Sequence, residues 1–160
     1  MVNKGDRIRQ LASNYLKQKL FLLKHLPLGL FVGLKLLKVD STNAVVSVPF
    51  KYLNKNPFRS IYFSVLSMAA ELSTGVLAMA AVYDAKKPIS MLLITMNAEF
   101  VKKAKTRVFF SCNNGENIVD TINKSIESKN GETIKLYSEG HDINNDLIAK
   151  FQFTWTFKPK

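Results

Sequence analysis

The chain has 160 residues, 47% of them apolar, so it is long enough and apolar enough to fold around one hydrophobic core. Its single cysteine, Cys112, excludes an internal disulfide framework and fits a reducing compartment. The chain has two histidines, His25 and His141, and together with Cys112 they do not have the spacing of zinc ligands. The net charge of +11 would suit nucleic acid, an acidic membrane surface or an anionic ligand, but the basic residues are spread along the chain without a nucleic-acid-binding motif, so we expect no nucleic-acid partner.

The first predicted element is an amphipathic helix over residues 7–25, because apolar residues recur there at helical spacing and Pro27 follows. The apolar stretch over residues 20–37 is interrupted by charged residues and a proline, so it is too short to span a membrane. It also lacks the pattern of a signal peptide, and the cytoplasm is the expected location. We expect a single domain, with an N-terminal helix in residues 1–27 and the core in residues 28–160.

The rest of the chain reads as strands around one unusual helix. Residues 61–83 contain no Lys or Arg, and their Ala, Met and Leu content favours a helix that is buried on nearly every side. A short surface helix is predicted at residues 117–128. The predicted strands are residues 32–39, 44–50, 91–101, 106–112, 133–141 and 147–157. An antiparallel sheet of about six strands wrapped around one long helix gives an α+β fold.

Glu71 is the only charged residue in the predicted buried helix. An ionised carboxylate in apolar surroundings is unfavourable, so it needs a partner or a task. Ser64, Ser67 and Thr74 fall at helical spacing with it, so the four residues share one helix face and form a candidate site lining. Burial would raise the pKa of the carboxyl group toward neutrality, which suits a general base. A structural interpretation stays open, in which the hydroxyls bond to helix carbonyls and the glutamate meets solvent or a lysine.

The segment Asn56-Pro-Phe-Arg-Ser-Ile-Tyr-Phe-Ser64, with Glu71 seven residues further on, resembles the phenylacetic-acid-type thioesterases of the hotdog superfamily. Their motif is Asn-x-x-Gly-x-x-His-Gly-Gly, followed by a helix that carries Asp or Glu. The spacing from Asn56 to Glu71 agrees without a gap, and residues 96–105 are similar to the family's long strand and basic corner. The resemblance covers roughly residues 28–158.

The chain also departs from that motif. Arg59 stands in place of the first glycine, Tyr62 in place of the histidine, and Phe63-Ser64 in place of the two glycines that let a thioester approach the backbone. The core segment Ala-Ala-Glu-Leu-Ser-Thr-Gly is similar to a hotdog subfamily labelled only as a domain of unknown function. The departures bear on activity more than on fold.

The resemblance implies a hotdog fold and a set of site residues. Glu71 matches the family's catalytic carboxylate, which activates water or attacks the thioester carbonyl. Asn56 would position the water or the carbonyl, unless it only caps the Pro57 turn. Ser67 and Thr74 would orient Glu71 or the water, unless they only fill space.

The backbone amides of Phe63 and Ser64 would form the oxyanion site, helped by the helix N-terminus. Five basic residues would contact the phosphates of coenzyme A or the arm of a carrier protein, unless they form only a solvated corner: Lys102, Lys103, Lys105, Arg107 and Arg59.

The predicted function is hydrolysis of an acyl thioester, acyl-CoA or acyl-carrier, with no metal and no cofactor beyond the coenzyme A of the substrate. The predicted assembly is a homodimer or tetramer, because a lone sheet leaves strand edges exposed. Two alternatives stay open. One is a non-catalytic acyl- or lipid-binding hotdog protein, and the other is a basic protein that docks on membranes or nucleic acid through its first helix.

Overall fold

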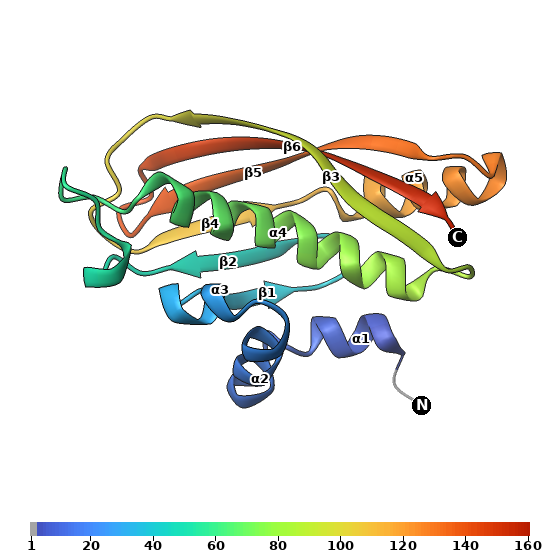
Figure 1. Cartoon of the computed structure of the whole chain (residues 1–160), viewed down its shortest axis with the longest axis horizontal. Helices are drawn as coiled ribbons and strands as arrows, with labels where there is room; N and C mark the ends of the chain where they lie inside the picture. The colour runs from blue at the N-terminus through green and yellow to red at the C-terminus, as the bar shows by residue number, and fades with distance from the viewer. Residues whose placement is uncertain (1–2) are drawn as a thin grey trace.

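The computed structural model describes residues 3–160, which form one antiparallel sheet wrapped around a long helix (Figure 1). The six strands of this part of the chain lie in the order β1-β2-β4-β5-β6-β3, so β1 and β3 are the two edges. They are β1 (Lys35–Val39), β2 (Ala44–Val48), β3 (Ile89–Phe100), β4 (Val108–Cys112), β5 (Glu132–Asp142) and β6 (Leu147–Pro159). The predicted α+β architecture is confirmed.

Helix α4 (Phe63–Asp84) is the centre of the core. Small and apolar side chains such as Ala69, Ala70 and Val76 are fully buried, which is why a helix with so few polar residues folds here. The sheet contributes the largest fully buried side chains, Phe110, Phe153 and Phe157. Among residues 3–160, α4 is the one helix long and apolar enough to cross a membrane, yet 67% of its most apolar window is buried within the protein. That degree of burial is typical of a core helix.

Residues 4–32 form three helices, so the predicted single helix over residues 7–25 is wrong. They are α1 (Lys4–Arg9), α2 (Tyr15–His25) and α3 (Pro27–Val32). The chain breaks before α2 because Asn14 caps it, with its Oδ1 accepting a hydrogen bond from the backbone N–H of Lys17 at 3.0 Å. Asparagine favours that role over a helix interior, since its side chain competes with the helical backbone.

Helix α2 is fastened to the edge strand β1 by the buried side chain of Gln18. Its Nε2 donates to the carbonyl oxygens of Leu36 at 2.8 Å and Leu11 at 3.1 Å, and its Oε1 accepts from the N–H of Leu36 at 3.2 Å. Gln18 thereby occupies the outward-facing backbone groups of Leu36 on the β1 edge, whereas no element of the described chain pairs with the outer side of β3.

The remaining elements lie at the two ends of the sheet. The predicted surface helix is confirmed as α5 (Gly115–Ser128), which buries Ile118 and Ile122. A short 3-10 helix, η1 (Tyr52–Asn54), leads into the loop that carries Asn56.

Candidate functional site

The carboxylate of Glu71 lies in a largely buried position in the middle of α4. Burial raises the pKa of this carboxyl group above its ordinary value, and neither a cation nor a hydrogen bond from residues 3–160 offsets that effect. It lines a cavity of about 310 Å³, the Glu71 pocket, between α4 and the sheet. The lining residues are Phe63, Ser64, Ser67, Met68 and Glu71 of α4, Leu93 and Met96 of β3, and Phe153 of β6. Three of the four polar residues predicted on one helix face therefore line one pocket.

Strand β3 is irregular where it borders this pocket. The pairing of β3 with β6 shifts between Leu93 and Thr95, so Ile94 is an extra residue at a bulge. Bulges bend a strand and redirect its side chains, and they are frequent at sheet edges and next to active sites. The irregularity lies between Leu93 and Met96, the two β3 residues of the lining.

Gly75 makes room for the carboxylate one helical turn beyond Glu71. A Cβ at this position would lie 2.9 Å from Oε1 of Glu71 and 3.5 Å from Cζ2 of Trp155. Glycine inside a helix lowers stability by about 1 kcal/mol relative to alanine. Here the missing side chain leaves space that the Glu71 carboxylate occupies. Sequence reasoning did not find Gly75, although a glycine four residues after a buried glutamate is a signal that would have found it. No local signal marked Trp155.

The hydroxyl of Thr74 is occupied elsewhere. It donates to the backbone oxygen of Glu71 at 2.9 Å and accepts a hydrogen bond from Nε1 of Trp155 at 3.1 Å. Thr74 is fully buried and does not line the Glu71 pocket. Thr74 therefore contacts Glu71 through its backbone oxygen rather than its carboxylate, because β6 places the indole over that turn of the helix, and its orienting role stays a prediction. Ser67 donates to the backbone oxygen of Phe63 at 2.9 Å but does line the pocket, so its role as an orienting residue stays a prediction.

The first turn of α4, about two turns before Glu71, has unbonded backbone amides. Within residues 3–160, the N–H groups of Val65 and Leu66 bond to the oxygen of Tyr62, whereas those of Phe63 and Ser64 find no acceptor. Unbonded amides at a helix N-terminus carry partial positive charge and attract an oxyanion. Phe63, Ser64 and Glu71 all line the same pocket, and the oxyanion role of the two amides stays a prediction.

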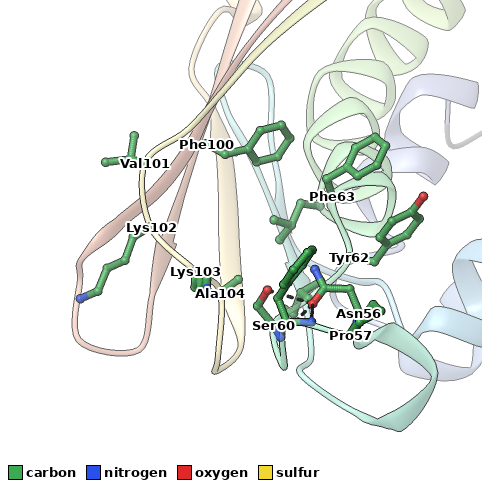
Figure 2. A pocket seen from close by; sticks show the side chains of 13 residues that line it. Asn56, Pro57, Ser60, Tyr62, Phe63, Phe100, Val101, Lys102, Lys103 and Ala104 are labelled. Atoms are coloured by element: carbon green, nitrogen blue, oxygen red, sulfur yellow. Dashed lines mark hydrogen bonds between the residues drawn. The ribbon is translucent and has the colours of Figure 1, made fainter.

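A second, larger cavity of about 510 Å³ adjoins the start of α4, and we call it the helix-start pocket (Figure 2). Its walls are apolar and aromatic: Phe58, Ile61, Tyr62, Phe63, Leu66 and Phe100. Phe63 is common to both pockets, and its ring lies edge-on to those of Tyr62 and Phe100, with centroids 4.7 Å and 6.2 Å away. The phenyl ring of Phe63 therefore stands where the two cavities meet.

Asn56 lines the helix-start pocket rather than the Glu71 pocket. Its Oδ1 accepts hydrogen bonds from the N–H of Phe58 at 3.0 Å and from the N–H and Oγ of Ser60, both at 3.2 Å (Figure 2). These bonds hold a turn in which Arg59 takes a left-handed backbone conformation, φ 57°. The Oδ1 of Asn56 thus caps the turn, which agrees with the structural reading of this residue.

The lysines of residues 102–105, which we call the basic corner (Lys102, Lys103 and Lys105), border the helix-start pocket in part. Lys102 reaches away from the aromatic walls (Figure 2). It forms an ion pair with Asp146. The Nζ of Lys103 lies 5.8 Å from the ring centroid of Phe58.

Arg107 does not join the basic corner. It donates to Oγ of Ser47 at 3.2 Å and lines a separate cavity beside α2. Neither Arg107 nor Arg59 lines the helix-start pocket. The five basic residues predicted to bind phosphate therefore do not line one cavity, and their contact with phosphate stays a prediction. Within residues 3–160, no group of three His, Cys, Asp or Glu side chains has the geometry to hold a metal ion.

Solved structures share this architecture. A protein of unknown function from Chlorobaculum tepidum matches with a TM-score of 0.77 at 17% identity, over 94% of this chain and 96% of that one. A Pseudomonas aeruginosa protein, described as a probable thioesterase, matches with a TM-score of 0.76 at 14% identity, over 91% and 96%. A thioesterase from Haemophilus influenzae matches with a TM-score of 0.64 at 13% identity, over 88% of each chain. No curated protein matches the sequence.

The six-stranded antiparallel sheet around α4 is thus the hotdog fold that the resemblance implied, and these solved structures share it. A family model for a domain of unknown function, DUF4442, matches residues 17–156. The chain belongs to this family, which confirms the likeness of its core helix to a subfamily without an assigned function.

Proposed function

We propose that the chain hydrolyses an acyl thioester, acyl-CoA or acyl-carrier, at the Glu71 pocket. The observation that carries this proposal is a partly buried carboxylate with a raised pKa, which lines the same pocket as two residues whose backbone amides are unbonded. An unpaired buried carboxylate is unfavourable for stability, so it is expected where it has a chemical task. Thioesterases among the structural neighbours agree with this class of reaction, although their similarity concerns the fold.

In the proposed reaction, Glu71 acts as general base and removes a proton from water. The hydroxide equivalent attacks the thioester carbonyl, and the amides of Phe63 and Ser64 stabilise the oxyanion. Collapse of the tetrahedral intermediate breaks the C–S bond, and the proton held by Glu71 passes to the departing thiolate. The products are a carboxylic acid and a free thiol. Attack by Glu71 itself on the carbonyl is the variant of this scheme, in which water then hydrolyses an anhydride.

The proposed active form is at least a homodimer formed along β3. This strand is an open edge, and the side chains of Leu92, Ile94 and Met96 on it are exposed. An exposed apolar edge strand is a template for pairing with another chain. Met96 also lines the Glu71 pocket, so a second copy paired at β3 covers that pocket and completes its wall.

The second candidate function is binding of an acyl chain without hydrolysis. It is favoured by the apolar helix-start pocket and by the side chains of Arg59, Tyr62 and Phe63 in place of the family's glycines and histidine. In this alternative the aromatic walls hold an acyl group, and no residue is catalytic.

Turnover of a panel of acyl-CoA substrates, monitored by thiol release, distinguishes the two functions. The hydrolase proposal predicts release that is lost in Glu71→Gln and retained in Glu116→Gln, a matched control on the exposed side of α5. Stoichiometric binding of acyl-CoA without thiol release would establish the binding function instead.

A further inference from the structure

Helix α2 turns a row of leucines outward. Leu16, Leu20 and Leu23 are 67%, 57% and 56% exposed, although they occur at helical spacing on one side of the helix. At about 100° per residue they lie within roughly 60° of one another. The opposite side is held against the domain by buried Leu22 and by Gln18 through its bonds to β1. The leucine stripe (Leu16, Leu20 and Leu23) therefore faces solvent in a fixed orientation, because the opposite side of α2 is anchored to the domain.

Lysines flank the leucine stripe on both sides. By the same helical spacing, Lys17 and Lys24 lie along one side and Lys19 along the other. None of these three lysines forms an ion pair within residues 3–160. The surrounding sequence has the same bias, since residues 7–70 contain ten Lys and Arg residues but a single acidic residue, Asp40. An apolar stripe with basic flanks is the pattern of a helix that lies in an anionic membrane interface.

A cationic cavity of about 450 Å³ lies beside α2 on the Lys19 side. Its charged lining residues are Lys19, Lys35 and Arg107, and no acidic residue lines it. The Nζ atoms of Lys19 and Lys35 lie 4.5 Å and 5.6 Å from the ring centroid of Tyr15, so like charges converge on one side chain. All three cations are exposed to solvent, so an anion that enters the cavity meets only positive charge. A phosphate group is the matching ligand, because it accepts hydrogen bonds from lysine and arginine together.

We propose that α2 docks this protein on the surface of an anionic lipid bilayer. The leucine stripe enters the boundary between headgroups and acyl chains, its flanking lysines lie at headgroup level, and the cationic cavity takes a lipid phosphate. Docking of a second copy on the same face would bring two lysine-flanked surfaces together, which like-charge repulsion disfavours. The phosphates of a nucleic acid would pair with the lysines, but the leucines would stay exposed to water. This proposal does not depend on the chemistry at Glu71.

The first test measures sedimentation of the full chain with vesicles of phosphatidylcholine alone and with vesicles that also contain phosphatidylglycerol. We expect strong binding only to the anionic vesicles, weakening as salt is raised. Replacing the three stripe leucines by glutamine, a good helix former, should weaken binding roughly tenfold per leucine. Replacing Lys17 and Lys24 by glutamine should weaken it roughly fivefold per lysine.

Matched controls change the same chemistry on other faces. Val119→Gln removes an exposed apolar residue of α5, and the double variant Lys135→Gln, Lys158→Gln removes two exposed charges from β5 and β6. Both should bind anionic vesicles as the wild type does, and all variants should unfold at the wild-type temperature. Equal binding of the leucine variants and the wild type would overturn the proposal and indicate a simple polyanion surface. A lower mass of the leucine variants by light scattering would overturn it in favour of a second copy.

A second test reads insertion directly. Cys112 is fully buried, so a Leu20→Cys variant offers one accessible thiol for an environment-sensitive fluorophore. We expect a blue shift on anionic vesicles and quenching by lipids that carry a quencher on the acyl chain. A probe attached at Val119→Cys should show neither effect. A Leu20 probe that stays in water while the protein sediments with vesicles would overturn the assignment of the leucine stripe.

Discussion

Replacement of Glu71 by glutamine separates the catalytic role of this residue from a structural one. Glutamine keeps the length and shape of the side chain but removes the basic oxygen. A lost general base lowers turnover by roughly 100-fold, which corresponds to about 2.7 kcal/mol of activation free energy. We therefore expect thiol release from acyl-CoA to fall by at least that factor, with little change in KM.

The same variant should fold as well as the wild type or better. The Glu71 carboxylate accepts no hydrogen bond and meets no cation within residues 3–160, so the amide leaves no donor without its partner. Because burial raises the folded-state pKa above that of the unfolded chain, the stability that this group contributes is present at acidic pH. It is lost as the pH rises through the raised pKa. The variant escapes this loss, so its advantage in free energy of unfolding should grow as the pH rises.

Three measurements on one preparation distinguish a catalytic from a structural role of Glu71: thiol release, the pH profile of kcat/KM, and denaturant unfolding at several pH values. In the wild type, kcat/KM should rise through the elevated pKa of Glu71 as the base form appears. Glu116→Gln serves as the matched control and should alter none of the three. Retained turnover together with lower stability in Glu71→Gln would refute the catalytic assignment.

Three further predictions concern neighbouring features. Gly75→Ala should stabilise the helix by up to about 1 kcal/mol but lower kcat roughly 10- to 100-fold, because the new Cβ displaces the Glu71 carboxylate. An unchanged kcat would show that the position of this carboxylate is not critical for catalysis. Light scattering at micromolar concentration should give a dimer mass or larger, and Leu92→Lys at the β3 edge should lower it; a monomeric wild type contradicts the proposed assembly. Reversing all three lysines of the basic corner to glutamate should raise KM for acyl-CoA and leave kcat intact, as should added salt; an unchanged KM would mean that the corner is only a solvated surface.

Periodicity and composition determined the elements of this fold. The apolar run over residues 61–83 contains no Lys or Arg, so only a helix enclosed by a sheet buries it, and α4 is that helix. The six strands and α5 followed from alternation and turn residues for the same local reasons. The break before α2 was missed, because helical spacing of apolar residues continues through Asn14 while its side chain caps the next helix.

The helical repeat also determined that Ser64, Ser67, Glu71 and Thr74 share a face, but it carries no information on what covers each turn. Only the tertiary structure decided that β3 leaves the first three on a pocket, while Trp155, 81 residues away, covers Thr74 and bonds to it. The charge of Glu71 was visible in the sequence. The burial that raises its pKa depends on the path of distant strands, because desolvation is set by all surrounding atoms rather than by neighbours along the chain.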